Sequence, residues 1–386
     1  MIRTPLSLGR VARLLVSAGI LAAVLLWLAS SGYEPADLGL GEQLIGRPGV
    51  GRFLVGGPQG WRSLDAEARD PAAGWALPDG LIGLPALAAD GSSMALLPTG
   101  LVRVGDNGEL RDGPELPGDD GGRSWELVGL DGSDRPVLAT QSGDGSRRLL
   151  VMDKLGAGWL ELTDSDGLAV LPKGTEVLLS KARRALAFLG QGCWEAWVFD
   201  EGIVRRVTAA DCSGGFGVFS PEGDALILDG RTDGIYRLEL DSGRFSFMAS
   251  GNLGYSERVP FSAGFRGDPV LMVSPVRDNE GNLQIMQTHL WGGSRYGITI
   301  GAVHHYHVTS SHDGRYLAYC QATFDEGGET AFDEALYLFD FDVGRAVYDF
   351  ERRGGGLRRG PLFVGDGPNM VFVANGRVLL LDPRDD

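Results

Sequence analysis

Four of the five histidines lie within residues 304–312, and they are the first candidates for chemistry. On a β-strand, His305 and His307 would point to one face and His304 to the other. Two imidazoles at this spacing can ligate one zinc or similar ion, although a third ligand has to come from elsewhere in the chain. We therefore predict a divalent metal at His305 and His307, and the alternative is that these residues simply pack between neighbouring strands.

The three cysteines suggest a disulfide more than a nucleophile. Cys193 and Cys212 are separated by a distance that fits two adjacent strands of one sheet, which permits a bond in an oxidising compartment. The sequence leaves open whether the two sulfurs meet. Cys320 ends the apolar run 316–320 and is expected to be a buried strand residue.

Other catalytic signatures are missing from the sequence. It contains no G-x-S-x-G nucleophile motif and no G-x-x-x-x-G-K phosphate-binding loop. The formal net charge of -16 argues against a nucleic-acid partner, because binding a phosphate backbone requires clustered cations. These observations favour a protein without catalytic residues and without a cofactor other than the divalent metal considered above.

The N-terminus has the pattern of an export signal. Arg3, Arg10 and Arg13 precede an apolar run over residues 14–29, an order typical of a signal peptide or signal anchor. We predict that residues 1–31 form this signal and that residues 32–45 form a linker. Cleavage before Gly32 and retention as a single membrane anchor both remain open. Either way, the rest of the chain is expected in the periplasm or on the outer face of the inner membrane, touching the membrane only through this segment.

A repeated pattern of turns and short strands dominates the rest of the chain. The 60 glycines and 19 prolines, together with 43% hydrophobic residues, predict many strands joined by tight turns. In residues 219–244, a turn at Ser220–Gly223 precedes one apolar strand, and a second strand follows over residues 235–240. Related units are centred near residues 91, 132, 182, 223, 267, 314 and 367, at steps of 41 to 53. This period is typical of four-stranded propeller blades.

From these seven units we predict an all-β propeller of seven blades over residues 46–386, preceded by an N-terminal apolar helix. Four-stranded sheets bury little surface alone, so each must stack on its neighbours around an axis. The final unit supplies only two strands before the chain ends. We expect the strands at 52–55 and 61–64 to complete this last blade and close the ring.

This pattern resembles the TolB-type, WD-like propeller repeats of periplasmic proteins. The resemblance lies in the turns Ser220–Gly223 and Ser311–Gly314 and in the strands at 235–240 and 336–340 that follow them. It implies an envelope protein that uses its propeller faces for protein contacts, and it carries no site residues to this chain.

The sequence therefore predicts a non-catalytic, exported propeller that binds or scaffolds another envelope protein. A metal-assisted hydrolase or lyase built on His304–His307 is one alternative. A small-ligand or glycan binder is another.

Overall fold

The computed structural model describes most of the chain from residue 35 to residue 382. The described residues are 35–47, 49–67, 74–118, 124–141, 147–153, 158–163, 171, 175–190, 193–200, 204–209, 216–229, 234–250, 263–266, 271–290, 294–324, 331–352 and 361–382. The predicted signal over residues 1–31 lies outside them. No helix in this described part has the length and apolar character needed to cross a membrane.

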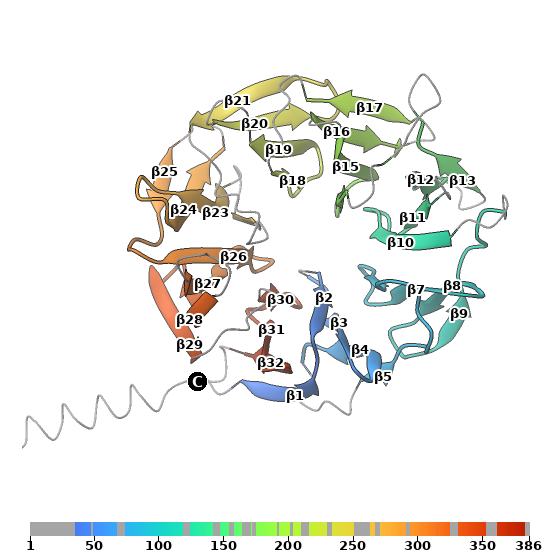
Figure 1. Ribbon diagram of the computed structural model, residues 1–386, viewed down its shortest axis with the longest axis horizontal. Coiled ribbons are helices and arrows are strands. Elements are labelled where there is room, and N and C mark those ends of the chain that lie inside the picture. Colours follow the sequence, from blue (N-terminus) through green and yellow to red (C-terminus); the bar gives the residue numbers. More distant parts are fainter. Residues whose placement is uncertain are drawn as a thin grey trace, which may run out of the picture.

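Eight four-stranded antiparallel sheets form a closed ring around a central channel (Figure 1). We number these blades in chain order and give their strands from the channel outward. Blade 1 contains β2 (Gln43–Gly46), β3 (Arg52–Gly57), β4 (Gly60–Asp65) and β5 (Trp75–Ala76). Blade 2 contains β6 (Ala86–Leu87), β7 (Ser93–Leu97), β8 (Gly100–Val104) and β9 (Leu110–Asp112). Blade 3 contains β10 (Ser124–Leu130), β11 (Pro136–Gln141), β12 (Arg147–Met152) and β13 (Trp159–Glu161).

The remaining blades follow the same order. Blade 4 contains β14 (Val177–Leu179), β15 (Ala185–Gly190), β16 (Cys193–Val198) and β17 (Arg205–Thr208), and blade 5 contains β18 (Gly217–Phe219), β19 (Ala225–Asp229), β20 (Gly234–Glu239) and β21 (Phe245–Ser250). Blade 6 contains β22 (Gly264–Arg266), β23 (Leu271–Arg277), β24 (Leu283–His289) and β25 (Arg295–Gly297), and blade 7 contains β26 (His304–Ser310), β27 (Tyr316–Phe324), β28 (Ala331–Asp340) and β29 (Arg345–Arg352). Blade 8 contains β30 (Leu362–Phe363), β31 (Met370–Ala374), β32 (Arg377–Leu381) and β1 (Ala36–Leu40).

The expectation of seven blades is wrong, because blade 1 was not recognised as a separate unit. Strands 52–55 and 61–64 do not complete the last blade; they belong to β3 and β4 in the middle of blade 1. The turn before β3 reads Arg-Pro-Gly-Val-Gly and contains neither serine nor aspartate, at least one of which is present in the turn of every other unit, so the repeat could not be traced through it.

An N-terminal strand does close the ring, but it comes from the predicted linker. β1 pairs antiparallel with β32, with Ala36 opposite Leu380 and Leu40 opposite Arg377. β2 also begins before residue 46. The propeller therefore starts ahead of the predicted boundary, and residues 36–46 carry strands that complete blade 8 and open blade 1.

The alternation of strand directions gives the ring two different faces. Within each blade, the turns after the first and third strands lie on one side, which we call the turn face. The turn after the second strand and the connection to the next blade lie on the opposite side, which we call the connector face. Every blade has the same strand order, so this division holds around the whole ring.

The core consists of eight apolar clusters, and each lies between two neighbouring blades. One cluster, for example, joins Leu38 and Val378 of blade 8 to Phe53 and Leu64 of blade 1. The other seven join the remaining pairs in order around the ring. Each blade thus buries both faces against its neighbours, which removes its apolar surface from water.

The turns on the turn face explain why the repeat carries serine, aspartate and glycine. In blade 5 the Ser220 hydroxyl donates a hydrogen bond to Asp224 (2.6 Å) and accepts one from the backbone N–H of Ala225 (3.1 Å). Gly223 has φ +69°, and a Cβ there would lie 2.5 Å from the hydroxyl of Ser180 in blade 4. Glycine is required because the backbone is left-handed and the turn of the preceding blade packs directly against it.

A buried ion pair ties blade 3 to blade 4. Arg184 Nε donates to Asp131 Oδ2 at 3.0 Å, and the two side chains are 8% and 1% exposed. Asp131 Oδ1 also accepts backbone hydrogen bonds from Ser133 and Arg135 in its own turn. The pair therefore fixes one turn and holds the neighbouring blade to it.

Removing the apolar contact of the closing strand should destabilise the ring. Leu38 is fully buried between blades 8 and 1, so Leu38→Ala should lower the free energy of unfolding by about 2–5 kcal/mol. Leu40 lies two residues further on in β1 and is 54% exposed, so Leu40→Ala should change it by less than about 0.5 kcal/mol. Denaturant unfolding of the purified variants measures both values. Equal effects would show that β1 does not close the core.

The buried ion pair should contribute more to the free energy of unfolding than an exposed ion pair does. Arg184→Met leaves the Asp131 carboxylate buried without its cation, so the free energy of unfolding should fall by about 3–5 kcal/mol. Arg244→Met removes a pair with Glu239 in which the arginine is 66% exposed, and it should lower the free energy of unfolding far less, because water screens the exposed charges. Denaturant unfolding measures the free energy of unfolding of both variants. A smaller decrease for Arg184→Met than for Arg244→Met would contradict the stabilising role of the buried pair.

Candidate functional site

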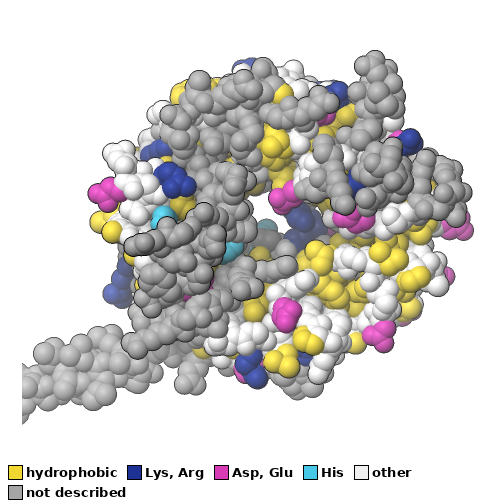
Figure 2. Space-filling model, viewed as in Figure 1, with side chains coloured by type: hydrophobic (Ala, Val, Ile, Leu, Met, Phe, Trp, Pro, Cys, Tyr) yellow, Lys and Arg dark blue, Asp and Glu magenta, His cyan; other side chains and the backbone are white. Residues whose placement is uncertain are grey.

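The candidate site is a cavity of about 670 Å³ at the turn-face end of the channel. Its walls come from the ends of the inner strands and the turns that follow them in blades 1, 4, 5, 6 and 7. Figure 2 shows the ring hollowed at its centre. The charged or titratable residues that line the cavity are Arg47, Lys181, Glu222, His312 and Asp313.

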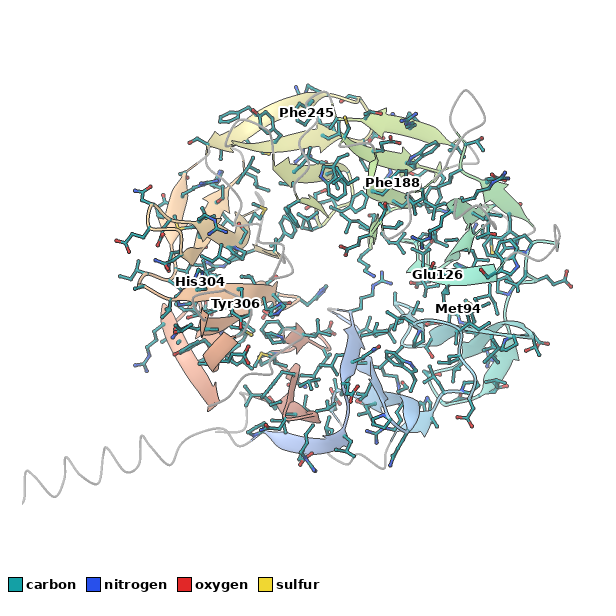
Figure 3. The ribbon with its side chains drawn as sticks, in the orientation of Figure 1. Met94, Glu126, Phe188, Phe245, His304 and Tyr306 are labelled. Atoms are coloured by element: carbon teal, nitrogen blue, oxygen red, sulfur yellow. The ribbon has the colours of Figure 1, made fainter. Side chains whose placement is uncertain are left out.

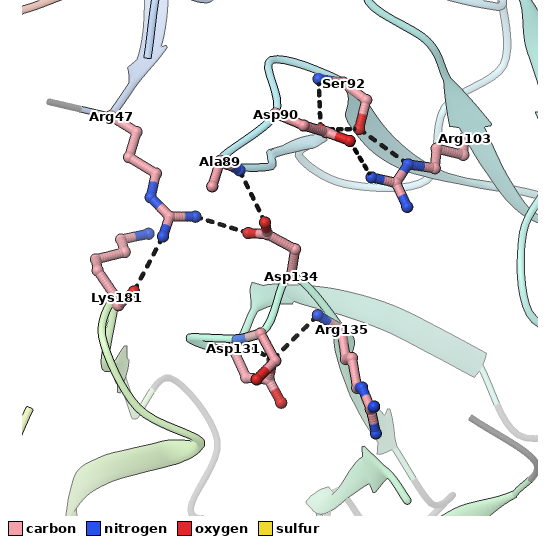
Figure 4. Close-up of polar contacts among 10 residues, drawn as sticks. Arg47, Ala89, Asp90, Ser92, Arg103, Asp131, Asp134, Arg135 and Lys181 are labelled. Carbon is pink, nitrogen blue, oxygen red and sulfur yellow. Dashed lines mark hydrogen bonds and ion pairs between the residues drawn. The ribbon is translucent and has the colours of Figure 1, made fainter. Parts of the chain in front are cut away.

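Arg47 extends from the end of β2 and links distant blades across the channel (Figure 4). Its Nη1 donates to Asp134 Oδ1 at 2.7 Å, and its Nη2 donates to the backbone carbonyl of Lys181 at 2.9 Å. Asp134 also accepts a hydrogen bond from the backbone N–H of Ala89 (3.0 Å). The network therefore connects blades 1, 2, 3 and 4 through one guanidinium and one carboxylate.

Asp134 is held for this contact by its turn. Its backbone is left-handed, with φ 57°, and its N–H donates to the carbonyl of Asp131. Among residues other than glycine, aspartate and asparagine adopt this conformation most readily. The same turn that carries the buried Asp131–Arg184 pair thus points the Asp134 carboxylate into the channel.

Lys181 places a second cation beside Arg47. Figure 4 shows its ammonium next to the Arg47 guanidinium, and no described residue accepts a hydrogen bond from it. The side chain is open to the channel but has protein around it, and this desolvation lowers its pKa. Repulsion from Arg47 lowers the pKa further, whereas the Asp134 carboxylate raises it. This end of the cavity therefore holds two cations and one anion.

His312 lies in the same cavity, in the first turn of blade 7. Its ring approaches the backbone of blade 1 at Gly49, where a Cβ would lie 3.2 Å from the imidazole. Gly49 also has φ +79°, so glycine is suited to this position in two ways. Of the four clustered histidines, His312 is the one that lines the cavity.

The other three histidines lie on β26, the innermost strand of blade 7 (Figure 3). Their pairing is interrupted: Tyr306 pairs with Cys320, and the next pair is Thr309 with Ala318. His307 sits within this bulge and has φ 52°. The regular alternation that would point His305 and His307 to one face is therefore broken between them.

The surroundings of these histidines are largely buried. His305 is 4% exposed and packs edge-on against Tyr319, with ring centroids 5.7 Å apart. Burial lowers the pKa of His307 to about 4, although the Glu334 carboxylate acts in the opposite direction. Within the described ranges no three His, Cys, Asp or Glu side chains gather as a metal site. The metal at His305 and His307 stays a prediction without a third ligand.

The cysteines occupy two different environments. Cys193 begins β16 and is disulfide-bonded, and the predicted partner Cys212 lies outside the described residues, so the pairing stays a prediction. Cys320 is a free, fully buried thiol, as expected for a strand residue. Burial raises the pKa of Cys320, which keeps its sulfur protonated and poorly reactive.

The connector face carries exposed apolar side chains near several blade connections. Ile300 precedes blade 7 and is 90% exposed; Ile82 and Leu84 precede blade 2 and are 41% and 50% exposed. Leu40, at the end of β1, is 54% exposed. Hydrophobic side chains also gather beside the channel over blades 1 and 2 in Figure 2.

Sequence reasoning missed the channel network altogether. In the chain, Arg47 is 87 positions from Asp134 and 134 positions from Lys181, and no sequence motif connects the three residues. The available signal was their position: each lies in or beside the first turn of its blade, and these turns converge on the axis.

The comparisons with known proteins identify the fold. No family model and no curated protein sequence matches the chain. The WD40 domain of SCAP from fission yeast is similar over 90% of this chain and 98% of that one, with 11% identity and a TM-score of 0.53. Sqt1 from Saccharomyces cerevisiae is similar over 91% and 98%, with 10% identity and a TM-score of 0.52. BamB from Moraxella catarrhalis reaches a TM-score of 0.49 at 12% identity over 89% and 99%.

At these identities the likeness shows a shared architecture. The chain is a β-propeller related in structure to WD40 propellers. The more specific resemblance to TolB-type repeats stays a prediction, since no family model matches.

We expect two substitutions in the charge network to shift the pKa of Lys181 in opposite directions. Arg47→Gln removes the neighbouring cation and should raise the pKa of Lys181, whereas Asp134→Asn removes the carboxylate and should lower it. The chain has only three lysines, Lys154, Lys173 and Lys181, so an NMR titration of labelled lysine side chains can follow each one. The variant Lys181→Arg lacks this lysine, so the NMR signal that disappears in it belongs to Lys181. Shifts of the same sign in both variants would contradict the arrangement.

Proposed function

We propose that this protein is a non-catalytic binding module whose connector face docks another protein of the bacterial cell envelope. The observation that carries the proposal is the exposure of large apolar side chains near blade connections, above all Ile300 at 90%. Burying such side chains against a partner removes apolar surface from water and favours binding. The ring holds the connections on a rigid scaffold, as in other proteins that present binding loops.

The enzyme alternative has less support. A hydrolase built on His304–His307 requires a metal with at least three protein ligands, and the bulge at His307 separates the two predicted ones. Cys320, which could otherwise act as a nucleophile, is buried and has a raised pKa. A binding role agrees better with these residues.

The N-terminal segment supports a location at the membrane. β1 runs from the turn face at Ala36 to the connector face at Leu40. Only residues 32–35 separate Ala36 from the predicted signal, a stretch that spans at most about 14 Å. If the segment is kept as an anchor, it holds the turn face toward the membrane and leaves the connector face free for a partner.

Site-specific photocrosslinking in intact cells tests the proposal. A photoreactive amino acid at Ile300 should join the protein to one defined partner. The same group at Val343 on the turn face, which is 52% exposed, should not give that product.

Substitutions should give the same contrast in affinity. Ile300→Glu should weaken binding of the crosslinked partner by about tenfold or more, because a charge replaces a buried apolar group, and Val343→Glu should leave it unchanged. Crosslinking from Val343 alone, or equal products from both positions, would contradict the proposal.

A further inference from the structure

The axial cavity has the dimensions and wall chemistry of a small-molecule site. Its volume of about 670 Å³ falls within the range of roughly 300–1,000 Å³ found for ligand pockets. Leu178, Val218 and Phe265, from three successive inner strands, supply an apolar wall. Arg47 and Lys181 line the same cavity and supply a cationic end.

The cationic end has unused hydrogen-bond donors. Arg47 uses one N–H toward Asp134 and one toward the Lys181 carbonyl, out of the five that a guanidinium carries. The ammonium of Lys181 has no hydrogen-bond acceptor among the described residues. Two cations side by side with one carboxylate leave a net positive charge that a bound anion would neutralise.

The acidic residues that line the cavity are Glu222 and Asp313, and neither is among the charges that shift the pKa of Lys181. Asp313 accepts hydrogen bonds from the Ser311 hydroxyl (2.5 Å) and from the backbone N–H of Arg315 (3.0 Å) within its own turn. Glu222 is exposed in the first turn of blade 5. The Arg47 and Lys181 end is therefore the part of the cavity suited to an anion.

We propose that this cavity binds a small organic anion that has one carboxylate or phosphate group and an apolar body of one or two rings. The anionic group accepts hydrogen bonds from Arg47 and Lys181, and the body lies against Leu178, Val218 and Phe265. Charge-assisted hydrogen bonds of this kind are stronger than neutral ones and orient the ligand. This site is separate from the connector face and does not depend on the proposed protein partner.

Four probes with the same ring system test the proposal on the full-length protein by isothermal titration calorimetry. They are 2-naphthoate, 2-naphthyl phosphate, the neutral 2-naphthylmethanol and the cationic 2-naphthylmethylammonium. We expect at least one anion to bind, and the neutral and cationic probes to bind more than tenfold more weakly. The stronger of the two anions identifies the preferred head group.

Two variants locate the binding. Lys181→Met should weaken the preferred anion by about tenfold or more, because it removes a charge-assisted hydrogen bond. Arg111→Gln removes one positive charge from exposed β9, so it controls for net charge and should leave binding unchanged. Both variants should keep the photocrosslink from Ile300, which separates this test from that of the proposed function.

Three results would overturn the anion site. The first is that neither anion binds at millimolar concentration. The second is equal binding of the neutral probe. The third is unchanged anion binding in the Lys181→Met variant while the protein remains folded by circular dichroism.

Discussion

Burial between neighbouring blades is the constraint on which the rest of this structure depends. A single four-stranded sheet has apolar side chains on both faces and cannot cover them itself. Each of the eight clusters is shared by two blades, so a blade is stable only with a neighbour on either side. An open row would leave two faces exposed to water. The ring therefore has to close, and β1 closes it by completing blade 8.

Closure also explains the chemistry of the turn face. Packing wedge-shaped sheets around an axis brings their first turns close together, as the approach of Gly223 to Ser180 shows. Polar groups in these crowded turns lose contact with water and need partners within the protein. The turn serines and aspartates satisfy the turn backbone, and pairs such as Asp131 with Arg184 connect successive blades.

The two faces consequently present different surfaces. On the turn face, residues such as Arg47, Asp134 and Lys181 converge on the axis and form a charged channel end. On the connector face, the links between blades carry apolar side chains that the core does not use, including Ile300 and Leu84. One architecture thus offers a small cavity with a charged end and a broad, partly apolar surface on opposite sides.

The sequence by itself determined the class of fold, because its evidence is local. Glycine, aspartate and serine in short turns and alternating strands such as residues 235–240 have a direct physical meaning in any context. This local evidence did not give the blade count, because the first turn of blade 1, at Arg47 and Gly49, lacks the repeated pattern. The local alternation likewise placed His305 and His307 on one face, but a bulge interrupts it.

Only the tertiary structure decided where the candidate site lies. Arg47 meets Asp134 and Lys181 because the ring brings the first turns of blades 1, 3 and 4 to a common axis, although these residues are far apart in the chain. No local pattern encodes such a meeting. Local sequence specifies each blade through short-range turn and strand preferences, whereas the channel results from the closure of all eight blades.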